Sequence, residues 1–167
     1  MRRDIENEIL PACADQGLGM LCWSPLAGGF LSGKYGRDQE LPEGSRISYR
    51  KNIDVPRYFS DQAFDVIDEL KTISTEIGKT PSQISLAWLL FDLRVTSVII
   101  GPKNVEQLKD TLEVADWNLE QEFHQRLETK LELPSGYPME WVELGFGNIS
   151  GKEEFKPDHY RFPLQRN

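Results

Sequence analysis

The stretch that decides the fold is GMLCWSPLAGG, which spans Gly19–Gly29. Its apolar start, Gly19–Trp23, predicts a short buried strand, and the proline and glycines that follow predict a loop where this strand ends. A second stretch, VTSVIIGPKN at Val95–Asn104, repeats the pattern. Its β-branched run, Val95–Ile100, is typical of a parallel-sheet strand that is buried on both faces. Parallel α/β proteins place ligand-binding groups where their strands end, so both loops are candidate sites.

Helices are predicted around these strands from apolar spacing, capping residues and stop signals. Two of them end at a glycine: Asp4–Asp15, followed by Gly17, and Asp61–Ile77, followed by Gly78. A third is capped by Thr80, with Pro81 and Gln83 in its first turn, and runs to Phe91. The last two are a helix capped by Asn104 and a helix over Leu119–Leu131. The segment Ser24–Ser60 has no sustained period and is predicted to be a long loop, which in a compact domain is usually functional. The order of elements fits the end of a parallel α/β barrel.

Length and composition limit the function classes. The chain has 167 residues, whereas an eight-stranded α/β barrel needs about 250, so we expect an incomplete barrel. The net charge of −8 argues against nucleic-acid binding, which needs clustered cations. No apolar run is long enough to span a membrane, and the charged N-terminus has no secretory pattern, so a cytoplasmic location is expected.

Cysteines and histidines give no sign of a metal site. Cys13 and Cys22 are expected to be buried thiols rather than a disulfide. His124 and His159 are far apart in sequence and stand in polar surroundings, without metal-ligand spacing.

The two stretches together resemble the aldo-keto reductases, in particular the branch with aryl-alcohol dehydrogenase-like enzymes and potassium-channel beta subunits. The resemblance covers Asp4–Val142 and implies that residues 1–142 are the C-terminal part of a (β/α)8 barrel. It also implies NADP(H) as cofactor. Residues 143–167 have no match and are expected to form an irregular, partly disordered tail. Pro134–Trp141 resembles the family's terminal loop, or is a plain surface-packing segment.

The resemblance implies that the first loop, after the seventh barrel strand, lines the cofactor diphosphate. The residues concerned are Trp23, Ser24, Pro25, Leu26, Ala27 and Gly28. Proline and glycine keep this backbone extended and small, so its amides can approach phosphate oxygens. Lys34 and Arg46 could add charge to the same anion.

The second loop resembles the family's site for the 2′-phosphate and adenosine. Gly101 ends the strand, Lys103 stands at the phosphate position, and Gln107 and Asp110 match adenosine contacts. The helix after Asn104 favours an anion by about 0.3–1 kcal/mol. Thr111 departs from the pattern, because the family often has Asn there, and the adenine contact at that position is therefore in doubt.

Structural readings stand beside these functional ones. Taken alone, the first loop is an ordinary strand-to-loop turn, and Asn104 with Gln107 is simply a helix start. Trp88 and Trp117 are interpreted as packing residues rather than stacking platforms, and the acidic run Glu120–Glu132 as a solvated helix face.

Catalysis in the aldo-keto reductases uses a tetrad of Asp, Tyr, Lys and His from the first half of the barrel. The resemblance implies that this sequence corresponds to the part of the barrel after that half. No catalytic residue is assigned, because none of the tyrosines has the required sequence context. Two functions stay open: the cofactor-binding part of an NADPH-dependent carbonyl reductase, or a non-catalytic regulatory or beta-subunit-like fragment. Unpaired sheet edges predict poor stability alone, and either self-association or a complementing fragment.

Overall fold

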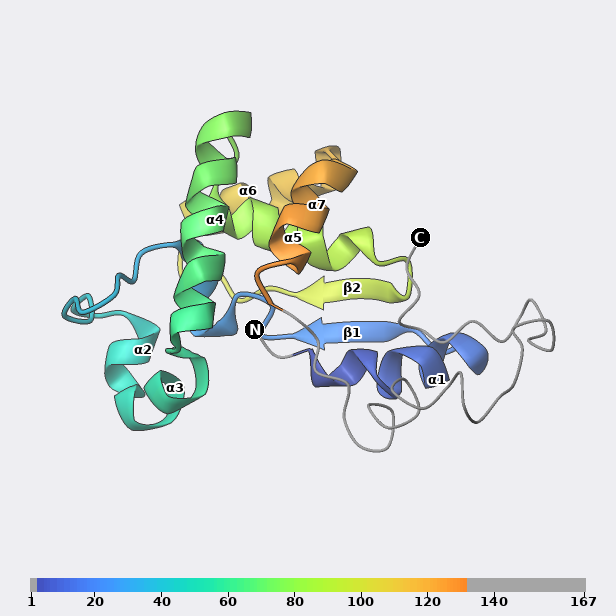
Figure 1. Cartoon of the computed structure of the whole chain (residues 1–167), viewed down its shortest axis with the longest axis horizontal. Helices are drawn as coiled ribbons and strands as arrows, with labels where there is room; N and C mark the ends of the chain where they lie inside the picture. Colours follow the sequence, from blue (N-terminus) through green and yellow to red (C-terminus); the bar gives the residue numbers. More distant parts are fainter. Residues whose placement is uncertain (1–2, 132–167) are drawn as a thin grey trace, which may run out of the picture.

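The computed structural model describes residues 3–131. They form an α/β structure around two parallel strands, β1 (Met20–Trp23) and β2 (Val95–Ile99). Both strands point toward α4 (Asp61–Ile77); α1 (Ile9–Asp15) lies on one side of the sheet, and α5 (Pro81–Phe91), α6 (Val105–Leu112) and α7 (Gln121–Glu128) lie on the other (Figure 1). The predicted tail 143–167, His159 and Pro134–Trp141 lie outside the described residues.

The two strands pair with one irregularity. Leu21 lies opposite Ser97 and Trp23 opposite Ile99, but the register shifts between Met20 and Leu21. The amide of Met20 donates instead to the hydroxyl of Thr96, at 3.0 Å. Trp23 and Ile99, the last residues of the two strands, lie opposite each other, so the loops that follow start side by side.

The predicted caps of α5 and α6 and the predicted stop of α4 are confirmed. The Thr80 hydroxyl accepts from the Gln83 amide, and the Gln83 side chain accepts from the Thr80 amide, which is the reciprocal cap expected for α5. Asn104 caps α6 by accepting from the Gln107 amide at 2.8 Å. Gly78 ends α4 with φ of 67°, a left-handed conformation that suits glycine.

The N-terminal and C-terminal helices are shorter than predicted. Asp4–Asp15 is split into a 3-10 turn, η1 (Asp4–Glu6), and α1. Pro11 lies in the first turn of α1, where its missing amide hydrogen is tolerated, whereas in one helix from Asp4 its ring would clash with the carbonyl of Asn7; the break falls just ahead of this turn. In place of Leu119–Leu131, α7 covers Gln121–Glu128, while Leu119 is buried ahead of it.

The prediction of an irregular loop over Ser24–Ser60 is wrong in part. Three short helices lie within it: η2 (Ala27–Ser32), α2 (Arg46–Tyr49) and α3 (Lys51–Tyr58). Buried anchors fix them to the core, where Phe30 and Ile47 are fully covered and Phe30 packs against Phe64 of α4 at 5.2 Å between ring centroids. Helices this short have too few turns to show a period, and packing rather than propensity stabilises them.

The prediction that both strands are buried is wrong for most of their side chains: Val95 is the only buried strand residue, and Thr96 and Ser97 are exposed together with three apolar side chains. Leu21 is 58% exposed, Trp23 66% and Ile99 49%. Only two strands pair in the part of the chain that is described, so nothing covers these side chains. The two strands therefore have the apolar composition of buried strands but expose part of it on an open surface of the sheet.

Other side-chain environments also differ from the predictions. His124 is not in polar surroundings: it is 8% exposed and stacks on Phe91 and Trp88, with ring centroids 4.0 and 5.5 Å away. Cys13 and Cys22 are free and only half-buried. Trp88 and Trp117 belong to the packing around the core, as predicted. Glu120 and Glu122 are exposed as predicted, whereas Glu128 pairs with Arg3 at 3.0 Å.

None of the helices within residues 3–131 combines the length and the apolar character that a membrane crossing requires.

Candidate functional site

A pocket of about 330 Å³ lies where β1 and β2 end. Its wall includes every predicted cofactor residue except Ala27, which is buried and lines a neighbouring pocket instead. These wall residues are Trp23, Ser24, Pro25, Leu26, Gly28, Lys34, Arg46, Gly101, Lys103, Gln107, Asp110 and Thr111. The wall also contains residues that were not predicted as cofactor contacts: Gly29, Ser32, Ser82, Ile99, Ile100 and Pro102. The two loops, more than 70 residues apart in sequence, therefore meet in one pocket.

The first loop has an unusual backbone path. Ser24 and Ala27 have φ of 54° and 49°, and Gly28 and Gly29 have φ of 68° and 90°. Left-handed conformations cost a non-glycine residue about 1–2 kcal/mol, and such strain clusters at functional sites. Two turn bonds hold the path, from the Ala27 amide to the Ser24 carbonyl and from the Gly29 amide to the Leu26 carbonyl. Turns of this kind direct successive amides to one side, which makes an anion-binding concavity.

Helices α2 and α3 support this loop from behind. A Cβ atom on Gly28 would lie 3.6 Å from the Asp54 carboxylate, 3.8 Å from Ile47 and 3.8 Å from the Tyr58 ring. Asp54 is 3% exposed; its Oδ2 has no hydrogen-bond partner in the described part of the chain and lies 3.5 Å from Nε of Arg50. The segment that sequence analysis treated as a loop thus builds the platform for the glycine turn.

Positive charge gathers at the pocket. Lys34, Arg46 and Lys103 line it, against one carboxylate from the described residues, Asp110. That carboxylate accepts from the Thr80 hydroxyl at 3.0 and 3.2 Å. Because the chain carries a net charge of −8, this concentration of cations departs from its average surface and favours an anionic ligand.

Lys103 links the two sides of the pocket. Its ammonium donates to the carbonyl of Gly44, 3.2 Å away and just ahead of α2. Its amide donates to the side-chain carbonyl of Gln107 at 2.9 Å. Arg46 begins α2 on the same side, held by the Ser45 cap, so cations from both loops face a common space.

Two helix N-termini also contribute to the wall. Gly101, Pro102 and Lys103 lead into α6, and Ser82 lies in the first turn of α5. Both ends carry partial positive charge. The Thr111 hydroxyl donates to the Gln107 and Leu108 carbonyls at 2.8 and 3.1 Å and is buried, so it presents no free proton to a ligand.

Proton donors and metal ligands are not brought together here. Among residues 3–131, the wall of this pocket includes no tyrosine; Tyr58 lines the neighbouring pocket, and the Tyr35 hydroxyl is buried in the core. Over the same residues, no cluster of His, Cys, Asp or Glu could hold a metal ion. The arrangement can bind and orient an extended anion.

Some wall residues could have been found from sequence. Gly29 is the last residue of the first stretch, and Ser82 is the second residue of a helix whose cap was recognised. Ser32 was not predicted as a contact; its hydroxyl donates to the Gly29 carbonyl at 2.7 Å and closes the glycine turn.

Comparison with known families decides the relationship. Residues 1–132 match the aldo/keto reductase family. The chain belongs to this family. Three relatives illustrate its range: "Uncharacterized oxidoreductase YrpG" of Bacillus subtilis is 33% identical over 81% of this chain. A "Probable voltage-gated potassium channel subunit beta" of Arabidopsis thaliana is 34% identical over 69%, and "Aldo-keto reductase yakc [NADP(+)]" of Schizosaccharomyces pombe is 32% identical over 63%.

Coverage is uneven between this aldo/keto reductase chain and its relatives. The matched regions are 39% of the Bacillus protein, 35% of the Arabidopsis protein and 30% of the Schizosaccharomyces protein. The chain thus spans well under half the length of these relatives. Both loops of the pocket fall within the family match.

Proposed function

We propose that the pocket binds NADP(H), and that the chain supplies part of the cofactor site of an aldo/keto reductase that reduces aldehydes or ketones. The observation that carries this proposal is the meeting of Lys34, Arg46 and Lys103 beside a left-handed glycine turn in an acidic chain. The name of the Schizosaccharomyces relative, which includes NADP(+), supports the same cofactor. The parallel strands fit the end of a (β/α)8 barrel, and we extend the proposal to that fold and to a cytoplasmic location.

Each part of the pocket has a proposed role. The turn from Ser24 to Gly29 receives the diphosphate, with Lys34 and Arg46 balancing its charge. Lys103 and the start of α6 hold the 2′-phosphate. To do so, the Lys103 ammonium gives up its hydrogen bond to the Gly44 carbonyl and donates to the phosphate instead. Gln107 and Asp110 border the adenosine. Since the Thr111 hydroxyl donates to its own helix, its methyl group is the part that meets the adenine.

The chemistry supplied by NADPH is hydride transfer to a carbonyl carbon. The residues of this pocket grip and orient the dinucleotide, and none of them is assigned as the proton donor. The proposal therefore assigns cofactor binding, and not proton donation, to the residues of this pocket.

The direct test is a titration of the chain with NADPH, followed by nucleotide fluorescence. Lys103→Glu is expected to weaken binding at least about tenfold, because it replaces a charge-assisted bond with repulsion. Lys51→Glu, an exposed cation of α3 outside the pocket, is the matched control and should bind like the unaltered chain. If both variants weaken NADPH binding equally, or if neither weakens it, the proposed phosphate contact of Lys103 is wrong.

A second candidate function is that of a non-catalytic subunit. It is favoured by the exposed apolar side chains Leu21, Trp23 and Ile99, which suit association with itself or another protein. The Arabidopsis relative, named as a probable channel subunit, fits this class. Loss of NADPH binding altogether, with a stable complex partner, would favour this candidate over the first.

A further inference from the structure

Helices α2 and α3 concentrate positive charge in a chain that is acidic on average. Residues 45–60 contain a single carboxylate, Asp54, although the chain as a whole has a net charge of −8. The same segment contains four cations, Arg46, Arg50, Lys51 and Arg57. Asp54 is buried, whereas Lys51 and Arg57 are exposed. The solvent side of this helix pair is therefore basic.

The cations of this segment differ in their partners from the arginines elsewhere in residues 3–131. Outside the segment, every described arginine pairs with a carboxylate; these are Arg3, Arg37, Arg94 and Arg126. Inside it, Nε of Arg50 lies 3.5 Å from the Asp54 carboxylate. Arg46, Lys51 and Arg57 have no carboxylate partner within the described residues. Arg46 lines the nucleotide pocket, so Lys51 and Arg57 are the two cations that this pocket leaves unused.

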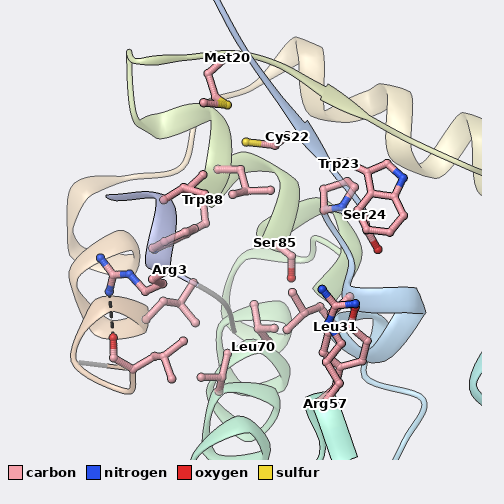
Figure 2. A pocket seen from close by; sticks show the side chains of 18 of the residues that line it. Arg3, Met20, Cys22, Trp23, Ser24, Leu31, Arg57, Leu70, Ser85 and Trp88 are labelled. Carbon is pink, nitrogen blue, oxygen red and sulfur yellow. Dashed lines mark hydrogen bonds between the residues drawn. The ribbon is translucent and has the colours of Figure 1, made fainter. Parts of the chain in front are cut away.

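Two large apolar side chains are exposed among these cations. Tyr49, the last residue of α2, is 79% exposed, and Ile53 of α3 is 57% exposed. Arg50, Ile53 and Arg57 follow one another at spacings of three and four residues, which places them along one side of a helix. In Figure 2, Arg57 extends from α3 at the edge of the pocket next to the nucleotide pocket. Basic and apolar groups therefore share one surface.

The two sides of this helix pair have different environments. Ile47, Asp54 and Tyr58 are buried and lie under Gly28 of the glycine turn, so they fix the pair to the core. In Figure 1, α2 and α3 project together beside one end of α4, away from α5, α6 and α7. The outer side is thus left uncovered by the other described helices.

We propose that this outer side docks an acidic segment of a partner protein. The docking surface, which we call the α2–α3 face, consists of Tyr49, Arg50, Lys51, Ile53 and Arg57. Carboxylates of the segment pair with the three cations, and an aliphatic or aromatic residue between them packs against Tyr49 and Ile53. Arginine and aromatic side chains are enriched at protein interfaces, which fits this composition.

Charge favours a protein segment over an anionic membrane. A membrane presents negative charge to the whole approaching side of the molecule, and a chain with a net charge of −8 is repelled by it. A short acidic segment meets only the local positive charge. Two exposed apolar side chains also give little area for insertion between lipids. The inference goes beyond the proposed cofactor site, since none of the five residues of the α2–α3 face lines the nucleotide pocket.

The test uses the full chain and a fluorescein-labelled peptide in which a central leucine and phenylalanine are flanked by three glutamates on each side. Fluorescence anisotropy should show binding that weakens as the salt concentration rises from about 20 to about 150 mM. The double variant Lys51→Glu with Arg57→Glu should bind at least about tenfold more weakly, because two attractions become repulsions. Lys71→Glu with Lys109→Glu makes the same change in net charge at exposed lysines of α4 and α6, and should bind like the unaltered chain.

Two further measurements separate the parts of the proposal. A peptide with serines in place of the central leucine and phenylalanine should bind several-fold more weakly, as should Ile53→Ser with the original peptide. NADPH affinity should be the same in the Lys51→Glu, Arg57→Glu double variant and the unaltered chain, so failure of peptide docking and failure of cofactor binding are distinguishable. Far-ultraviolet circular dichroism checks the fold of each variant.

Several outcomes would overturn the proposal. Equal weakening by the two double variants, or equal binding of the serine peptide, would reduce the effect to general charge attraction. Absence of binding up to about 1 mM peptide would remove the docking site. Binding to phosphatidylserine vesicles without binding to the peptide would assign the α2–α3 face to a membrane. A dimer of the chain that the Lys51→Glu, Arg57→Glu variant abolishes, and that excludes the peptide, would assign it to a second copy.

Discussion

Gly28→Ala isolates the role of the glycine turn in the proposed cofactor site. Gly28 has φ of 68°, and an added Cβ would meet Asp54, Ile47 and Tyr58 at 3.6 to 3.8 Å, which is ordinary contact. The expected loss of stability is therefore the left-handed backbone cost alone, about 1 kcal/mol. In a chain of this length, that corresponds to a fall in Tm of roughly 3 °C.

A matched control has the same backbone conformation elsewhere. Gly78, which ends α4, has φ of 67° and open space around its Cβ position. Gly78→Ala should lose as much stability as Gly28→Ala in urea unfolding, within about 0.5 kcal/mol. The added methyl group points away from the pocket, toward Asp54 and Tyr58, so NADPH affinity should fall for Gly28→Ala only through a shift of its left-handed backbone in the pocket wall, and should not fall for Gly78→Ala.

Two outcomes would refute this reasoning. A loss above about 3 kcal/mol for Gly28→Ala would mean that its cage of side chains is too rigid for a methyl group. Equal NADPH affinity in Gly28→Ala and the unaltered chain would mean that the left-handed backbone at Gly28 does not determine cofactor binding.

Two further predictions concern titrating groups. The Arg126 guanidinium lowers the pKa of Glu76 by a hydrogen bond, so this pair stabilises the fold above the ordinary Glu pKa of 4.5, and its contribution is lost as pH falls further. Glu76→Gln should therefore lose less free energy of unfolding, measured in urea, than the unaltered chain when the pH falls from neutral to below 4.5. An equal loss in both proteins would contradict the pairing. Burial is the main cause that raises the pKa of the Cys22 thiol, and the negative charge of Asp92 adds to it. In a Cys13→Ser background, Asp92→Asn should therefore let alkylation of Cys22 begin to speed up at a lower pH than it does with Asp92 present. An identical pH profile would exclude the influence of Asp92.

Local rules explain what could be predicted from sequence. The caps at Thr80 and Asn104 and the stops at Gly17 and Gly78 depend on neighbouring residues alone, and the structure reproduces them. The pocket was also accessible from sequence, because a loop that follows a parallel strand must emerge at the carboxyl edge of the sheet. Lys34 and Arg46 reach the same pocket only through the fold of the intervening chain.

Features that depend on tertiary packing could not be predicted. Helices α2 and α3 are held by buried Ile47 and Tyr58, and their short sequences show no period. Asp54 gave no sign of lying under Gly28, since its position depends on how α3 packs. Strand composition likewise indicated burial, whereas exposure of Trp23 depends on which elements cover the sheet.

The central claim is that the second loop, around Lys103, recognises the 2′-phosphate of the dinucleotide. Isothermal titration calorimetry of the unaltered chain with NADP+ and with NAD+ tests it most directly, because the two ligands differ only in that phosphate. The account predicts that NADP+ binds at least about tenfold more tightly, and that Lys103→Glu removes the difference. Equal affinities in the unaltered chain, or a preference that survives Lys103→Glu, would contradict it.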